Sequence, residues 1–344
     1  MLEFLFEYGL FLAKTVTFVI AVMIIVAVIV SAAMKQKAKK GHLEIIDLSE
    51  QFKETEQDIS HSLLSKEQLK KKEKLDKKQA KAQAKLDKNA EPAEQPKLFV
   101  VDFKGSIDAK EVSALREEIS AILMIAKPTD EVFVRLESGG GMVHGYGLAA
   151  SQLDRLRQHQ IPLTIAVDKV AASGGYMMAC VADKIISAPF AIVGSIGVIA
   201  QIPNFNKVLK NHDVEFEQLT AGEYKRTLTM FGENTDKGRE KFVAELEEIH
   251  QLFKNYVVER RTGLEINQVA TGEHWFGTKA KALGLVDEIQ TSDDYLYSAA
   301  KNHKVIQLKF EQRKGLAEKL SKAASLTVDN VIGKLWQHNR IFPS

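Results

Sequence analysis

The sequence is poor in cysteine, which excludes two kinds of stabilised site. Cys180 is the single cysteine among 344 residues, so the chain can form neither an internal disulfide framework nor a zinc site built from cysteines. It lies in an apolar run, which favours a small buried side chain. Net charge is also low, because 47 basic and 45 acidic residues leave a formal charge of +2. This balance gives no reason to expect a nucleic acid as partner.

Charged residues are absent from a long stretch near the N-terminus. Residues 15–33 are nineteen uncharged positions, and as a helix they approach the ~30 Å of a bilayer core. A cleaved signal peptide is the alternative, but its apolar region is usually shorter, about 7–15 residues, and follows a basic patch. Here Glu3 and Glu7 precede the stretch and lysines follow from Lys35 onward. We expect a permanent membrane anchor over residues 1–34.

The next segment, residues 35–96, has the opposite composition. Residues 66–88 hold ten lysines against four acids, with neither glycine nor proline, which is typical of a solvated helical linker. A polybasic segment on anionic lipid is the alternative. Two prolines in residues 90–97 mark the start of a globular domain, which we expect over 97–300. An amphipathic extension over 301–344 follows, as a surface helix, an oligomer contact or a membrane-surface helix.

Strand-like and helix-like patterns alternate through this domain, which predicts an α/β fold of βαβ units with parallel strands. Functional groups in such folds gather at the carboxyl ends of the strands. Both the glycine run 139–141 and Ser173 follow predicted strand ends, and this places them on one edge of the sheet. We predict strands over 98–103, 131–138 and 162–168, helices over 109–126, 142–158 and 235–261, and a loop, short helix and final strand over 270–289.

A second uncharged stretch, residues 185–202, is long enough to suggest another membrane span. It contains Pro189, Gly194 and Gly197, and its β-branched residues suit buried parallel strands. We therefore expect it to be part of the domain core.

Ser173 is the candidate nucleophile, because it lies between two alanines and two glycines that would allow a sharp turn. A following helix would aim free N–H groups at developing negative charge. By itself this turn is a weak signal. The base could be a histidine or a lysine kept neutral by burial. Lys225 is the lysine candidate, while the flanking sequences of the histidines show no pattern of a catalytic base; these are His144, His212, His250 and His274.

Three blocks carry a resemblance: VDKVAASGGYMMACVADKI, AIVGSIGVIAQIPNF and TAGEYKRTLT. In this order they resemble the SohB-type members of the signal peptide peptidase A family, over about residues 97–300. The resemblance implies a crotonase-like, caseinolytic-protease-like fold and a Ser/Lys dyad that needs no metal or cofactor. It makes Ser173 the nucleophile, Lys225 the general base and Ser195 the residue that orients the lysine. Gly140 and Gly174 would supply the N–H groups for the oxyanion.

The glycine run departs from the family pattern at Gly139, where Ser-Pro-Gly-Gly is common. Proline would fix φ near −65°, so glycine should make the loop more mobile and turnover slower. Apolar residues near the site, Val193, Ile196, Val198 and Ile199, would favour small or apolar substrate residues.

The resemblance implies a membrane-anchored serine endopeptidase that cleaves signal-peptide remnants or misfolded membrane segments. A crotonase-like acyl-CoA enzyme and a catalytically silent membrane scaffold are the alternatives. Expected partners are peptide or membrane-protein substrates, the lipid bilayer and further copies of the chain in a ring. The expected location is the bacterial inner membrane. The family implies a periplasmic catalytic domain, whereas Lys35 to Lys40 favour the cytoplasmic side.

Overall fold

The computed structural model describes residues 2–35, 41–65, 67–72, 74, 75, 78 and 95–311. The chain divides into two units: one joins Met1–His42 with Glu311–Ser344, and the other is Leu43–Phe310. Two expected segments lie largely outside the described residues: most of the lysine-rich region 66–88, and the extension 301–344 from residue 312 onward.

The first unit contains helix α1, Leu2–Lys35. Its segment Phe6–Ile24 is long and apolar enough to cross a membrane by length and composition, and its side chains are exposed. The stretch expected to be an anchor from its lack of charge is therefore helical.

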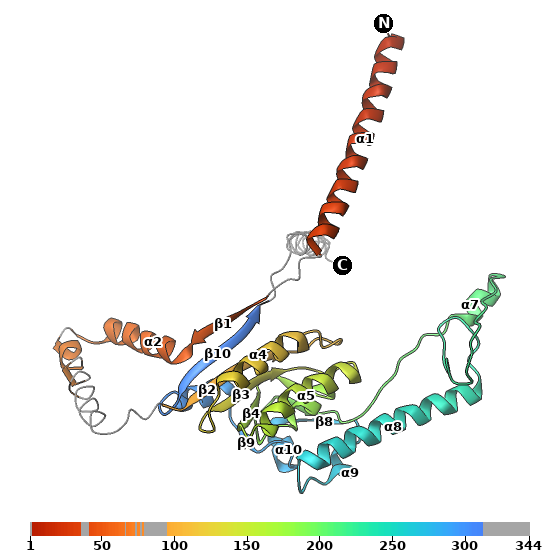
Figure 1. Cartoon of the computed structure of the whole chain (residues 1–344). Coiled ribbons are helices and arrows are strands. Elements are labelled where there is room, and N and C mark those ends of the chain that lie inside the picture. The colour runs from red at the N-terminus through yellow and green to blue at the C-terminus, as the bar shows by residue number, and fades with distance from the viewer. Residues whose placement is uncertain are drawn as a thin grey trace, which may run out of the picture. The chain divides into compact units, whose positions relative to one another are not determined.

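The second unit is built on a seven-stranded sheet in the order β1-β10-β2-β3-β4-β6-β9 (Figure 1). Neighbours from β10 to β9 pair in parallel, as the alternating pattern predicts. The strands are β1 His42–Asp47, β2 Lys97–Lys104, β3 Glu131–Glu137, β4 Leu163–Val167, β6 Lys184–Ser187, β9 Glu288–Ile289 and β10 Lys304–Glu311. The predicted α/β class is confirmed.

Helices cover both faces of this sheet. Successive residues of a strand point to opposite sides, so apolar strand residues face helices on each side. On β3, Val132 and Val134 join the main core with α4 and α5, whereas Phe133 faces a smaller cluster with α2 and α11. Phe133 stacks on Tyr295 at 4.7 Å between ring centroids. The helices are α2 Leu48–Leu63, α4 Val112–Ile125, α5 Val143–Gln158, α6 Gly174–Ala179, α7 Asn206–Asn211, α8 Asp236–Arg260, α9 Ile266–Val269, α10 Gly277–Ala282 and α11 Ser292–Ala299.

A second, three-stranded sheet carries the turn that holds Ser173. Its order is β5-β7-β8, with β5 (Val170–Ala172) parallel to β7 (Ile192–Gly194) and β8 (His274–Phe276) antiparallel to β7. The first part of residues 185–202 thus contributes β6 to the main sheet and β7 to the second sheet. Four of its apolar residues are fully buried: Ile185, Ile186, Val193 and Ile196. The prediction of a core segment is confirmed for this part, while Ile199 is 79% exposed.

The expected domain boundaries at residues 96 and 300 differ from the structure. Strand β1 forms the edge of the main sheet, and Leu48 and Phe52 of α2 pack against the core. Strand β10 lies between β1 and β2. The residues expected to be linker and extension therefore contribute two strands. The strands that pair with β1 and β10 are far away in the sequence, so no local pattern predicts that these segments join the sheet.

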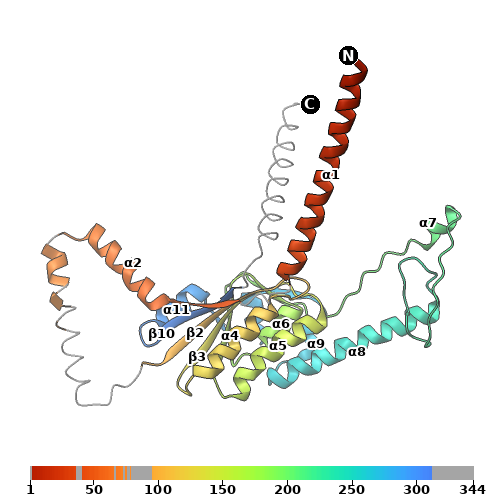
Figure 2. The same cartoon turned by 45° about the horizontal axis from the view of Figure 1, so that its top comes forward.

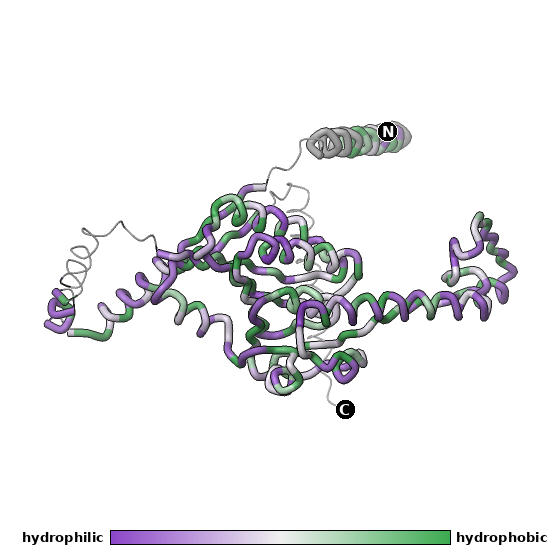
Figure 3. Tube along the Cα trace, turned by 60° about the horizontal axis from the view of Figure 1, so that its bottom comes forward, coloured by the Kyte–Doolittle hydropathy of each residue, from purple (hydrophilic) through white to green (hydrophobic). Residues whose placement is uncertain are grey.

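Residues 199–235, which we call the arm, connect β7 to α8 and contain α7. Figures 1 and 2 show α7 and the N-terminal end of α8 away from the sheet. The apolar stripe of α8 is buried at its C-terminal end, at Phe253 and Val257, whereas Phe242, Leu246 and Ile249 are half-buried. Figure 3 shows hydrophobic residues recurring along this projecting part of the chain. In a single chain, most side chains of the arm are thus exposed, and the N-terminal part of α8 is at most half-buried.

Candidate active site

Ser173 occupies a strained turn between β5 and α6. Its backbone angles are φ 53° and ψ −120°, a conformation that residues with a side chain rarely adopt and that is concentrated at functional sites. Its N–H donates to the carbonyl of Gly194 at 2.8 Å, and its own carbonyl accepts from Met177 N–H at 3.0 Å to begin the helix. The half-buried serine is thus fixed at a helix N-terminus.

The two glycines after Ser173 are required by close packing. A Cβ at Gly174 would overlap the ring of Tyr146, and a Cβ at Gly175 would overlap the carbonyl of Ser138. The N–H of Gly174 is the first in α6, where helix geometry leaves donors without an intrahelical acceptor. It is therefore suitably placed to stabilise negative charge next to Ser173.

Ser195 lies beside Ser173, because the strands that precede them pair with Ala172 opposite Gly194. It too has a positive φ, 50°, and its N–H donates to the carbonyl of Glu273 at 2.7 Å. Two strained serines therefore leave the carboxyl ends of adjacent parallel strands. The structure brings these two predicted site residues together.

Gly140 lies directly against the Ser173 turn. A Cβ added to it would be 2.7 Å from both Gly174 N and Ser173 Cβ, and its φ is +88°, so only glycine suits the position. Its N–H, however, donates to the Ser138 hydroxyl at 3.0 Å. Gly140 is thus in the predicted place, with its amide engaged by a side chain. Its role as oxyanion donor stays a prediction.

Lys225 lies in the arm, with an exposed side chain. Its loop is attached to the first turns of α8, where Lys237 binds Glu223 at 2.6 Å and lies over the Tyr224 ring. Within the described part of the chain, no hydrogen bond or ion pair joins Lys225 to Ser173. The dyad implied by the resemblance is therefore not assembled in a single chain, and it stays a prediction.

The four histidines that were weighed as bases do not form a dyad either. Across the described residues, none of them shares a hydrogen bond with Ser173. His144, His212 and His274 are exposed, and His212 uses Nδ1 to contact the Val208 carbonyl at 2.9 Å.

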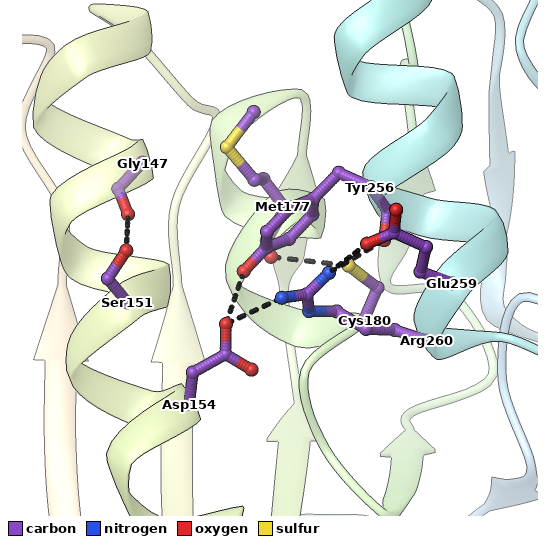
Figure 4. Close-up of polar contacts among 8 residues, drawn as sticks. All are labelled: Gly147, Ser151, Asp154, Met177, Cys180, Tyr256, Glu259 and Arg260. Atoms are coloured by element: carbon purple, nitrogen blue, oxygen red, sulfur yellow. Dashed lines mark hydrogen bonds and ion pairs between the residues drawn. The ribbon is translucent and has the colours of Figure 1, made fainter. Parts of the chain in front are cut away.

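A polar cluster attaches the C-terminal end of α8 next to α6, the helix that follows Ser173 (Figure 4). Asp154 of α5 accepts from Tyr256 at 3.1 Å and from Arg260 at 2.7 Å. The Arg260 guanidinium stacks on the Tyr256 ring at 3.5 Å from its centroid. Beside it, burial raises the pKa of Cys180 to about 12, and the thiol donates to the Met177 carbonyl. Cys180 is thus the inert buried side chain that its apolar surroundings predicted.

Comparison with known families identifies the chain. The description "Peptidase family S49 N-terminal" matches residues 3–153, and "Peptidase family S49" matches residues 155–306. A protein of Haemophilus influenzae named "Probable protease SohB" is 52% identical over 337 residues, covering 96% of each chain. The chain belongs to peptidase family S49.

Two other relatives are similar to this chain over different lengths. A "Probable protease SohB" of Buchnera aphidicola is 48% identical over 97% of this chain and 98% of its own. A putative protease of Methanocaldococcus jannaschii is 30% identical over 54% of this chain and 61% of its own. The resemblance inferred from the three sequence blocks is thereby confirmed, and this S49 chain is a protease by family.

Sequence reasoning missed Ser138 and Tyr146, which lie beneath the Ser173 turn. The Ser138 hydroxyl lies 2.5 Å from the Tyr146 hydroxyl, which in turn donates to the Ser106 carbonyl at 2.8 Å. Both side chains are almost fully buried. The only signal in the sequence was that Ser138 directly precedes the glycine run.

Proposed function

We propose that this S49 protease is a membrane-anchored serine endopeptidase with Ser173 as nucleophile and Lys225 as general base. The strained turn of Ser173 is the observation that carries the proposal, because a non-glycine residue at φ 53° persists only where the surrounding structure enforces it. Here that turn presents the hydroxyl at the start of a helix, where backbone N–H groups are available as donors for an oxyanion.

In the proposed reaction, neutral Lys225 removes the Ser173 proton as the hydroxyl oxygen attacks a peptide carbonyl. The N–H groups of Gly174 and Gly140 stabilise the oxyanion, each by about 2.7–4 kcal/mol in analogy with known donors. Lysine then protonates the leaving amine and activates the water that hydrolyses the acyl-enzyme. Ser195, beside the nucleophile, holds the lysine amine in place.

A second copy of the chain supplies Lys225 in this proposal. The arm is held to α8 rather than to the Ser173 turn, and it carries exposed hydrophobic side chains such as Leu219, 92% exposed, and Phe216, 44% exposed. Docking the arm of one copy on the next would bury this surface and close a ring of identical contacts.

Helix α1 would hold this ring in the bacterial inner membrane. Its substrates would then be peptide segments at the membrane, such as signal-peptide remnants and misfolded membrane segments. Val193 and Ile196 are fully buried in the core, so the preference for small or apolar substrate residues rests on Val198 and Ile199 in this proposal.

Complementation between inactive variants tests this arrangement. Ser173→Ala and Lys225→Ala should each abolish hydrolysis of a membrane-derived peptide. Their co-expression should restore roughly a quarter of wild-type activity, because random pairing of subunits recreates an intact serine–lysine pair in that share of sites. A mixture of Ser173→Ala with the double variant is the matched control and should stay inactive.

Two results would contradict the proposal. Full activity of the Ser173→Ala protein would exclude this serine as nucleophile. Two inactive single variants that never complement each other would place the dyad within one chain.

A further inference from the structure

A chain of three hydrogen bonds runs beneath the active-site turn, and its direction is fixed. The Tyr146 hydroxyl has one proton, which it donates to the Ser106 carbonyl. In the contact between Ser138 and Tyr146, the serine must therefore be the donor. The Ser138 oxygen then accepts the N–H of Gly140 at 3.0 Å.

This chain is protected from solvent and from ionisation. Ser138 is 2% exposed and Tyr146 is fully buried. Burial raises the pKa of Tyr146, so its hydroxyl keeps its proton and continues to donate. The acceptor offered to Gly140 is therefore constant in the resting protein.

The engaged amide is the one that the proposed mechanism requires for the oxyanion. Gly140 lies against Ser173 Cβ and Gly174 N, but its N–H points at the Ser138 side chain beneath the turn. A donor lowers the barrier only if it is aimed at the oxygen on which charge develops. In this orientation, Gly174 is the donor at the oxyanion position.

The backbone allows the Gly140 amide to turn. The peptide that carries this N–H joins two glycines, Gly139 and Gly140, so its rotation meets no Cβ barrier. A Cβ at Gly139 would have nothing within 4 Å, and Gly139 is exposed. A substrate oxyanion is also a stronger acceptor than a neutral hydroxyl, so it can take the N–H from Ser138.

We propose that Ser138 is a positioning residue that holds the Gly140 amide in a resting orientation, from which a bound substrate must release it before acylation. The inference rests on the proposed serine peptidase function. It predicts that the resting hydrogen bond slows turnover, because it is exchanged in each catalytic cycle.

The test is turnover of a fluorogenic peptide by the full-length protein in lipid or detergent. Ser138→Ala removes the acceptor, so kcat should rise about three- to tenfold, the equivalent of one neutral hydrogen bond, with little change in KM. A merely structural role would leave kcat unchanged or lower it. Ser151→Ala, which removes a hydroxyl bonded to the Gly147 carbonyl on α5, is the matched control and should match wild type.

A second variant keeps the test decisive if Ser138→Ala does not fold. Tyr146→Phe retains the ring that packs on the Gly174 turn but removes the acceptor that orients the Ser138 hydroxyl. It should raise kcat in the same direction by a smaller factor. A folded variant of either kind whose kcat equals or falls below that of wild type overturns the role of Ser138. The proposed function itself fails only if hydrolysis by wild type does not depend on Ser173, so the two failures are distinguishable.

Discussion

The turn around Ser173 and the arm around Lys225 are opposites in physical terms. The turn is enclosed by the main core, with strained backbone angles and glycines that admit no side chain. The arm is exposed and is tied mainly to α8 and to itself. One member of the predicted dyad, Ser173, is thus built into the core of the fold, while the other, Lys225, is exposed on the arm. Variants that separate folding from activity would sharpen this contrast.

The largest contrast should come from one substitution in each region, Lys225→Ala in the arm and Gly174→Ala in the Ser173 turn. Lys225→Ala should lower kcat by about 10⁴-fold or more, as for other paired catalytic groups, with the free energy of unfolding unchanged because the side chain is exposed. Gly174→Ala should also destroy activity but cost about 1–3 kcal/mol of stability, because its Cβ would overlap the Tyr146 ring. Peptide hydrolysis and urea denaturation measure the two effects. Equal losses of stability would remove the contrast.

The next largest contrast should be in stability, when one hydrophobic side chain in the core and one in the arm are each truncated to alanine. Phe253→Ala, at the buried end of α8, should lower the free energy of unfolding by about 3–5 kcal/mol, since the ring is 4% exposed. Leu219→Ala in the arm should change it by less than about 0.5 kcal/mol, since this side chain is 92% exposed. Denaturation at low protein concentration is the measurement. A large effect of Leu219→Ala there would show that the arm is already packed in single chains.

A smaller effect should depend on pH and on Glu118, which is buried on α4. Burial raises the pKa of this carboxyl to about 7, although Phe310 N–H donates to it at 2.7 Å. Asp102 raises the pKa further and Lys309 lowers it. Because the pKa in the folded state exceeds the unfolded value, stability should decline as pH rises from about 4.5 to about 7, by at most about 3 kcal/mol.

The matched control for this pH dependence is Glu118→Gln, which keeps an acceptor for Phe310 N–H. Its stability should vary less with pH than that of wild type over the same range. Parallel curves for the two proteins would show that another group titrates.

Local patterns in the sequence predicted much of the fold and part of the site. The alternation of strands and helices gave the parallel sheet, and the small residues around Ser173 correctly indicated a tight turn before a helix. Predicted strand ends placed the glycine run with Ser173, the resemblance added Ser195, and the structure has both Gly140 and Ser195 beside Ser173. These features depend on residues close in sequence or on the regular register of parallel strands.

Other features escaped prediction because they depend on contacts between distant segments. Strands β1 and β10 join the sheet although the composition around them suggested linker and extension. The Ser138–Tyr146 pair forms only when α5 packs beneath the Gly140 loop. The apolar stripe on α8 suggested packing along its whole length, but only its C-terminal end is buried in this chain.

By itself, the sequence determined the α/β class, the apolar N-terminal helix and the peptidase family, because composition, periodicity and ordered motifs are properties of the chain. Only the tertiary structure decided which way the Gly140 amide points and that, among the described residues, Lys225 shares no hydrogen bond with Ser173. Both outcomes depend on how segments far apart in the sequence, including the long helix α8, pack against each other. Short-range propensity carries no information about such packing.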